Sequence, residues 1–332
     1  MPIFLPILKS SGQLNQLHIT VCNVGSRKIN TQDDYASVGW NIFAPNLTIY
    51  GFDADPEACD AANADLEARQ VNWIEKHVPL ALSNAPGEST LYVTQHPMCS
   101  SLYPPNEPYL SRFSGLPELV NLDFTVEIET TTLDEFCQQE AVTDIDFLQI
   151  DVQGADLLVL QGGQNLLERS VLAVQIEVEF SPLYSNQPLF SDVDTFLRSR
   201  DFSLFHLASS HRVRMRSPIQ SFSHPGQLLW ADAFYFRDLL RSDFDRTQLK
   251  TPEQLFKLAC IADVMDFPDY ALELLEALTL QYGDNPDYNC ADAIVMGLAN
   301  FSELKAQGLE QLPIVENVRQ YLSDSAIALL KS

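Results

Sequence analysis

Residues 144–163 read DIDFLQIDVQGADLLVLQGG, and this stretch decides the fold. Ile145–Ile150 is a nearly continuous apolar run that ends at Asp151, and a helix is predicted from Gly154 to Leu160. A second apolar run, VLAVQIEV, follows at Val171–Val178. Apolar runs of this length are typical of strands that are covered on both faces, as in a parallel sheet.

Outward from this stretch, strand and helix patterns alternate over residues 18 to about 236. Further strands are predicted at His18–Val24, Leu47–Phe52, residues 71–82 and 89–94, Phe124–Glu129, Phe202–Leu207 and Gln227–Arg237. Helices are predicted at Pro56–Arg69 (with Asp55 as N-cap), Leu133–Gln139 and Asp192–Ser199. Because only a loop separates the last two strands, they are expected to be antiparallel. The pattern indicates an α/β fold with an open, doubly wound sheet and one reversed strand near its edge.

The rest of the chain divides into an N-terminal extension, residues 1–17, and a helical tail. We expect the α/β domain to cover residues 18–240 and a C-terminal α-helical appendage to cover residues 250–332. Helices are predicted in the tail at Pro252–Met265, Tyr270–Leu280, Ala291–Leu304 and Ile314–Leu330. This appendage could be a packing cap on the sheet domain or a module for protein interaction, and the sequence leaves both open.

Composition excludes several classes of protein. The chain has 20 Lys+Arg and 45 Asp+Glu, a formal net charge of −25. This charge argues against a general nucleic-acid binder and against adhesion to anionic membranes, which both need a basic surface. No segment has the roughly 20 apolar residues of a membrane span, and the start MPIFLPIL makes a poor signal peptide. The six cysteines form no CxxC motif, which favours a reducing cytoplasm.

Three predicted strand ends carry residues that could bind a ligand. They are Gly25 in the run Asn23-Val24-Gly25-Ser26, then Asp53, then Asp151. Open α/β sheets bind ligands at the carboxyl ends of their strands, and an acid after the second strand can accept both hydroxyls of a ribose. Alternatively, Gly25 belongs to a plain turn and the two aspartates cap helices. The sequence has no GxGxxG and no Walker motif, so a cofactor with ribose and adenine but no phosphate fits better, which points to S-adenosylmethionine.

Several separate blocks, in order, resemble FkbM-type methyltransferases. They are DIDFLQIDVQGADLLVLQGG at 144–163, LTIYGFDADP at 47–56, ALSNAPGESTLYVT at 81–94, CSSLYPPN at 99–106, and VQIEVEFSPLY with QPLFSDVDTFL at 174–197. The resemblance covers roughly residues 18–237. It implies a class I methyltransferase-like (Rossmann-like) sheet of seven strands with the last antiparallel. It also implies O-methylation, with S-adenosylmethionine, of a hydroxyl on a sugar, glycan or polyketide-like small molecule. The first motif departs from the family pattern at Asn23 and Lys28, so the alternative is a non-catalytic scaffold that binds partners through its helical tail.

From these observations we predict the residues of the methyl-donor site and of the catalytic base. The donor site is expected at Asn23, Gly25, Ser26, Asp53, Ala54, Leu82 and Asp151. The base that accepts the hydroxyl proton is expected to be Asp151, with Glu177 and His206 as the other candidates. Asp151 and Glu177 together could bind Mg²⁺, but no third ligand is visible, so a metal is not expected.

The acceptor is expected to contact two further segments. Ser100, Ser101 and Tyr103 belong to a proline-rich loop, residues 96–122, that could be a lid or a rigid crossover. Arg212 and Arg214 alternate in the basic run 211–216, where they could bind an anionic part of the acceptor or pair with the protein's own acids. The identity of the acceptor and the oligomeric state are not predicted.

Overall fold

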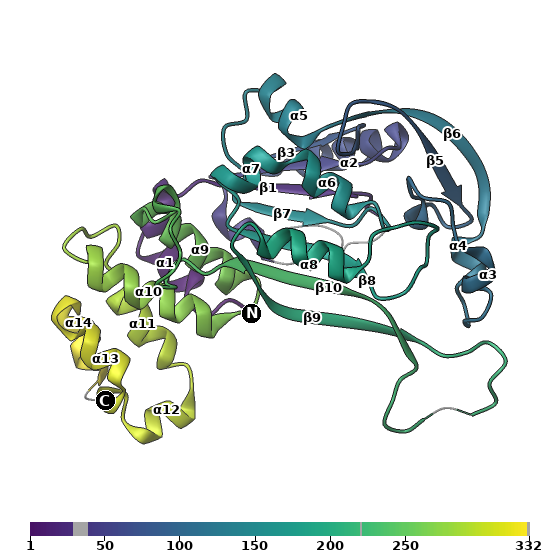
Figure 1. Cartoon of the computed structure of the whole chain (residues 1–332). Coiled ribbons are helices and arrows are strands. Elements are labelled where there is room, and N and C mark those ends of the chain that lie inside the picture. The colour runs from purple at the N-terminus through teal and green to yellow at the C-terminus, as the bar shows by residue number, and fades with distance from the viewer. Residues whose placement is uncertain (29–38, 220, 331–332) are drawn as a thin grey trace. The chain divides into compact units, whose positions relative to one another are not determined.

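The computed structural model describes residues 1–28, 39–219 and 221–330 (Figure 1). These residues form two units. One holds residues 1–19, 39–48 and 239–330, and the other holds residues 20–28 and 49–238. Among the described residues, no helix combines the length and the hydropathy that a membrane crossing needs.

The second unit is built on a seven-stranded sheet (Figure 1). Its strands, in spatial order, are β3 (Ile74–Val78), β2 (Leu47–Phe52), β1 (Ile19–Val24), β7 (Phe147–Ile150), β8 (Ala173–Glu179), β10 (Gln227–Arg237) and β9 (Phe202–Arg212). β1, β7 and β8 pair in parallel, whereas β10 is antiparallel to both β8 and β9. The predicted class I methyltransferase-like sheet with its reversed last strand is confirmed.

Helices flank this sheet: α2 (Pro56–Arg69), α5 (Leu133–Gln139), α6 (Asp156–Gly162), α7 (Gln164–Arg169) and α8 (Phe190–Arg198). Asp55 caps α2 as predicted, because its carboxylate accepts the Glu57 N–H at 2.9 Å. The expected start of α6 at Gly154 was wrong. Gly154 has a φ of +89°, outside the helical region, and Asp156 accepts its N–H at 2.9 Å, so the helix begins at Asp156.

A second, smaller sheet was not expected from the sequence. It has three strands in the order β4 (Ala81–Leu82), β6 (Leu122–Thr131) and β5 (Gly87–Thr94). β5 and β6 are antiparallel, with Leu91 opposite Val126 and Val93 opposite Phe124. The connection between them, predicted as a loop, contains the short helices η4 (Pro97–Cys99), α3 (Glu107–Leu110) and α4 (Pro117–Val120).

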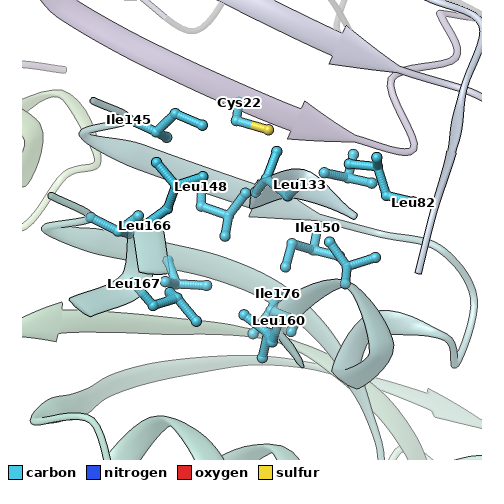
Figure 2. Packing of buried hydrophobic residues seen from close by; sticks show 14 of the residues in the cluster. Cys22, Leu82, Leu133, Ile145, Leu148, Ile150, Leu160, Leu166, Leu167 and Ile176 are labelled. Atoms are coloured by element: carbon cyan, nitrogen blue, oxygen red, sulfur yellow. The ribbon is translucent and has the colours of Figure 1, made fainter. Parts of the chain in front are cut away.

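The core of the sheet unit lies between the large sheet and its helices. Cys22, Leu148, Ile150 and Ile176 project from three adjacent strands, and Leu160 packs against them from α6 (Figure 2). All five side chains are almost fully buried. Full burial of one such side chain stabilises the fold by about 1.5–3 kcal/mol, which explains why the apolar runs that opened the sequence analysis form strands.

The other unit is helical. It contains α1 (Leu5–Ser10), η1 (Gln13–Gln16), η3 (Trp40–Phe43), η5 (Thr247–Leu249), α9 (Pro252–Val264), α10 (Pro268–Tyr282), α11 (Ala291–Leu298), α12 (Ser302–Gln307), η6 (Leu309–Gln311), α13 (Pro313–Val318), η7 (Arg319–Tyr321) and α14 (Asp324–Leu330). The first two predicted tail helices correspond to α9 and α10. The two longer ones are broken. Ala291–Leu304 is divided into α11 and α12, and Ile314–Leu330 is divided into α13, η7 and α14, the last of which starts where the Ser323 hydroxyl accepts the Ala326 N–H.

Candidate active site

A cavity of about 640 Å³ opens at the carboxyl ends of β1, β2 and β7. This size is within the range of small-molecule and cofactor sites. Its lining brings together seven of the residues predicted from the sequence: Gly25, Asp53, Ala54, Leu82, Ser100, Ser101 and Asp151. These residues come from four strand ends and from the connection between β5 and β6.

Hydrogen bonds between strand ends fix the floor of the cavity. The N–H groups of Gly25 and Ser26 both donate to the Phe52 carbonyl, at 2.9 and 2.8 Å, and the Asp151 N–H donates to the Val24 carbonyl at 2.9 Å. Gly25 has a φ of +87°, and a Cβ there would lie 1.9 Å from the Asp151 carbonyl oxygen. A glycine is therefore required at this position, where the backbone borders the cavity.

Asp53 lies at the end of β2 and accepts the Asp55 N–H at 2.8 Å. Arg27 is paired with Asp53 at 3.4 Å and with Asp55 at 2.6 Å, and all three residues line the cavity. Arg27 was missed in the sequence analysis. Its only signal there was its position two residues after Gly25.

Two residues predicted to bind the donor do not line the cavity. Asn23 is buried within β1. The buried Ser26 hydroxyl lies 2.9 Å from His77 Nδ1, and the other ring nitrogen of His77 lies 3.0 Å from Glu75. The Ser26 hydroxyl is thus engaged by His77 instead of facing the cavity.

Lys28, where the first motif departs from the family pattern, does not line the cavity. Its Nζ lies 2.6 Å from Glu75. Burial opposes ionisation of Glu75, but hydrogen bonds from His77, Lys28 and Trp73 outweigh it and lower the pKa of Glu75 to about 2. Lys28 thus neutralises a buried carboxylate, and one of the two arguments for a non-catalytic scaffold loses its basis.

Asp151 and Glu177 meet at one amide. Gln153 Nε2 donates to Asp151 Oδ1 at 2.8 Å and to Glu177 Oε2 at 2.7 Å. Burial and the nearby charge of Asp151 raise the pKa of Glu177 well above its ordinary value. Burial also raises the pKa of Asp151, but hydrogen bonds from Gln153 and Glu177 act in the opposite direction. Glu177 therefore retains the proton of the pair, and Asp151 is the carboxylate that faces the cavity and ionises first.

His206 is not brought to this site. It was expected at the end of its strand, but β9 continues to Arg212, so His206 lies in mid-strand. Its side chain is exposed, and its ring lies 6.0 Å from that of Phe234. His206 is also outside the lining of the cavity.

Tyr103, Arg212 and Arg214 also lie outside the cavity lining. Tyr103 packs on an apolar cluster that contains Phe113 and Tyr184. The Arg212 guanidinium stacks on Trp230 at 4.6 Å, and that of Arg214 stacks on Phe113 at 4.4 Å. Neither arginine has a carboxylate partner within the described part of the chain.

One wall of the cavity is an apolar surface that the sequence analysis missed. It is formed by one face of the small sheet, with the side chains Leu91, Val93, Phe124, Val126 and Ile128. Phe124 remains 54% exposed and Val126 40%. The sequence did carry a signal, because Phe124, Val126 and Ile128 alternate with polar residues. No group of three or more His, Cys, Asp or Glu residues in the described ranges is arranged to hold a metal ion.

The sequence profile described as Methyltransferase FkbM domain matches residues 40–204. No curated protein matches the chain.

The similar solved structures are distant. Methyltransferase FkbM from Methylobacillus flagellatus KT is 12% identical, with a TM-score of 0.36, over 67% of this chain and 45% of that one, so the match spans less than half of that protein. A putative tRNA (m1A22) methyltransferase of Streptococcus pneumoniae is 8% identical, with a TM-score of 0.32, over 96% and 98% of the two chains. M. capricolum TrmK, solved with S-adenosyl-homocysteine, is 9% identical, with a TM-score of 0.31, over 93% and 94%.

Proposed function

Residues 40–204 belong to the FkbM family of methyltransferases, and from this premise we propose that the chain methylates a hydroxyl oxygen of a small-molecule or glycan acceptor with S-adenosylmethionine. One observation carries the proposal furthest. Gly25, Asp53 and Asp151 follow three adjacent strands of the sheet and line the same cavity. Such strand ends are where open α/β sheets bind their ligands.

The residues of the cavity fit this methyl donor. Asp53 offers a carboxylate at the end of the second strand, where a ribose is bound in related sheets. Gly25 lets a ligand approach the backbone, since it carries no Cβ. When bound, S-adenosylmethionine supplies a methyl group on a positively charged sulfur, and the negative charge of Asp151 is suited to such a ligand.

The protein's part in the reaction is to align the acceptor and to remove its proton. We assign the role of base, which accepts this proton, to Asp151, the carboxylate of the Asp151–Glu177 pair that faces the cavity. A base of this kind accelerates a reaction by roughly 10²–10⁴-fold. Glu177 stabilises the charged form of Asp151, because protonated Glu177 can donate a hydrogen bond to the Asp151 carboxylate.

The part of the cavity that would hold the acceptor has a polar and an apolar part. Ser100 and Ser101 offer polar groups, while the apolar wall from Leu91 to Ile128 fits a ring or an aliphatic segment of the acceptor. Among the lining residues that the structure describes, Arg27 carries the one positive charge, and two aspartates neutralise it. This lining favours a small acceptor over a nucleic acid, which needs uncompensated cations.

Two finer parts of the proposal concern the outer part of the acceptor and the cellular compartment. Tyr103, Arg212 and Arg214 would contact a part of the acceptor that extends beyond the cavity, and the two arginines are suited to an anionic group because no carboxylate in the described residues occupies them. All six cysteines are free thiols, which supports a reducing compartment such as the cytoplasm.

Two measurements test the function. Isothermal titration with S-adenosylmethionine should show binding to the wild-type protein, and a screen of hydroxylated acceptors with a labelled methyl donor should find turnover. In Asp151→Asn, turnover should fall on the order of 100-fold or more, while donor binding changes little. Wild-type turnover in this variant would remove Asp151 from the role of base.

A further inference from the structure

Gln153 is hydrogen-bonded to both carboxylates of the Asp151–Glu177 pair and to two further side chains. Both hydrogens of its amide are used, one on Asp151 and one on Glu177. Its Oε1 accepts the Tyr184 hydroxyl at 2.9 Å, and its backbone carbonyl accepts the Ser101 hydroxyl at 2.6 Å. Gln153 has a φ of +56°, which is uncommon for a residue other than glycine. Its backbone conformation is therefore dictated by its surroundings.

The two hydrogens of the Gln153 amide stabilise negative charge on the Asp151–Glu177 pair, and the residues around the pair make this contribution important. Among the described residues, the titratable groups that act most strongly on the pair are acids: Asp156 from α6, Glu179 from β8, Asp232 from β10, and Tyr184 and Cys99 from loops. A charge on Asp151 therefore receives no help from a neighbouring cation among the groups that act on it. Hydrogen bonds from Gln153 Nε2, from Glu177 and from the Gln153 backbone N–H favour the charged form of Asp151, and the first of these is the largest.

The same glutamine connects the pair to the connection between β5 and β6. The Tyr184 hydroxyl lies 2.8 Å from the Cys99 carbonyl and 2.9 Å from Gln153 Oε1. A hydroxyl has one hydrogen, so it serves one of these two acceptors fully at a time. Ser101 ties the same segment to the backbone of Gln153. The orientation of the Gln153 amide thus depends on residues 99–101, of which Ser100 and Ser101 also line the cavity.

We propose that Gln153 is the positioning residue of the reaction, which holds Asp151 charged and aimed at the cavity and couples it to residues 99–101. The proposal deepens the proposed function and rests on it for the reaction itself. The hydrogen-bond network, however, makes a claim about protonation that can be tested without any acceptor.

The test is a pH titration of the protonated carboxyl band by infrared difference spectroscopy, on the full-length chain. Asp151→Asn and Glu177→Gln identify the part of the band that belongs to the pair. In Gln153→Met, which keeps the length of the side chain but removes both donors, the midpoint of that part should rise by about 1 pH unit or more. Tyr184→Phe, which removes the hydrogen bond to Oε1 together with that to the Cys99 carbonyl, should shift it in the same direction by less.

Gln70→Met is the matched control, because Gln70 is exposed and has a similar left-handed backbone, with a φ of +51°. It should leave the midpoint where it is in the wild type. If Gln153→Met lowers the melting temperature but leaves the midpoint unchanged, Gln153 has a structural role only and the proposal is overturned. If Gln153→Met does not fold, an unchanged midpoint in Tyr184→Phe has the same consequence. Titration of the wild type with S-adenosylhomocysteine tests the proposed function separately. If S-adenosylhomocysteine did not bind, the proposed function would fail, but the infrared result on Gln153 would still be valid.

Discussion

At the scale of single residues, partners decide what a buried carboxylate does. Glu75 and Asp156 are both acids with little contact to water, yet the pKa of Glu75 is lowered to about 2 and that of Asp156 is raised to about 7. Glu75 has a lysine, a histidine and an indole N–H as partners. Asp156 is buried beside Asp151, and hydrogen bonds from three backbone N–H groups offset only part of the effect. Buried acids that have no cation as a partner therefore have raised pKa values and keep their protons at higher pH.

Asp53 provides the prediction for donor binding. Asp53→Ala should weaken binding of S-adenosylmethionine by about 1.5–3 kcal/mol, because a charged hydrogen-bond acceptor is lost. Isothermal titration measures the effect. Asp60→Ala, on the exposed face of α2, is the control and should bind as the wild type does. Equal affinities for all three proteins would remove Asp53 from the donor site.

Single residues could be predicted from the sequence where their role follows from position along the chain. Asp53 and Asp151 directly follow apolar strands, so the sheet edge could be inferred from the pattern alone. Gln153 and Arg27 could not be found in this way, because their partners Glu177 and Asp53 lie on other strands. His206 was misplaced because β9 extends five residues beyond the predicted end at Leu207.

At the scale of elements, the junction of β1 with β7 depends on the absence of one Cβ. Gly25 and Gly115 have nearly equal φ values, +87° and +80°, but nothing lies within 4 Å of a Cβ built on Gly115. Gly115→Ala should cost about 1–2 kcal/mol for its backbone alone. Gly25→Ala should cost at least about 2 kcal/mol more, since the Asp151 carbonyl must move. Urea unfolding of both variants compares the two, and equal losses would contradict the close contact.

The start of α1 depends on one aspartate from α9. Asp263 accepts the N–H groups of Ile3, Phe4 and Leu5 at 2.8–2.9 Å and is almost fully buried. Asp263→Ala should destabilise the helical unit by about 2 kcal/mol or more, since three buried donors lose their acceptor. Hydrogen exchange at residues 3–8 should speed up accordingly. Glu273→Ala, an exposed site on α10, should leave exchange there unchanged, and protection at wild-type level in Asp263→Ala would refute the cap.

Elements could be predicted where burial on both faces leaves a continuous apolar run, as in β7 and β8. The small sheet was harder, because β4 has two residues and most of β6 is exposed on both faces. The last two tail helices were predicted too long, since breaks such as that before α14, where the Ser323 hydroxyl accepts the Ala326 N–H, depend on local capping and not on apolar periodicity.

At the scale of the whole molecule, the two units do not follow the order of the chain. Residues 1–19 form one unit with residues 239–330, through contacts such as that of Asp263 with the first residues of α1. Local patterns carry no information about such contacts, because the segments are more than 250 positions apart. The sheet unit, by contrast, is nearly continuous in sequence and could be inferred from it.

The acids of the sheet unit predict an unusual dependence of stability on pH. Burial, followed by the charge of Asp151, raises the pKa of Asp156 to about 7 and that of Asp232 to about 6. The folded state therefore binds more protons than the unfolded chain above about pH 4, and its free energy of unfolding should fall as the pH rises from about 4 to 7. Glu75, with its pKa lowered to about 2, acts in the opposite sense and loses its contribution as the pH falls from about 4 to 2.

The maximum of stability should consequently lie on the acid side of neutrality. Urea unfolding of the ligand-free protein, followed by the fluorescence of Trp73 and Trp230 in the sheet unit, should give a higher free energy of unfolding at about pH 5 than at about pH 8. Asp232→Asn should flatten the decrease between about pH 4 and 6, because it removes the group that titrates there. A free energy of unfolding that rises from pH 5 to 8 would mean that these acids are ionised in the folded state. Asp151 would then need a compensating cation, which is absent among the groups that act on it in the described residues.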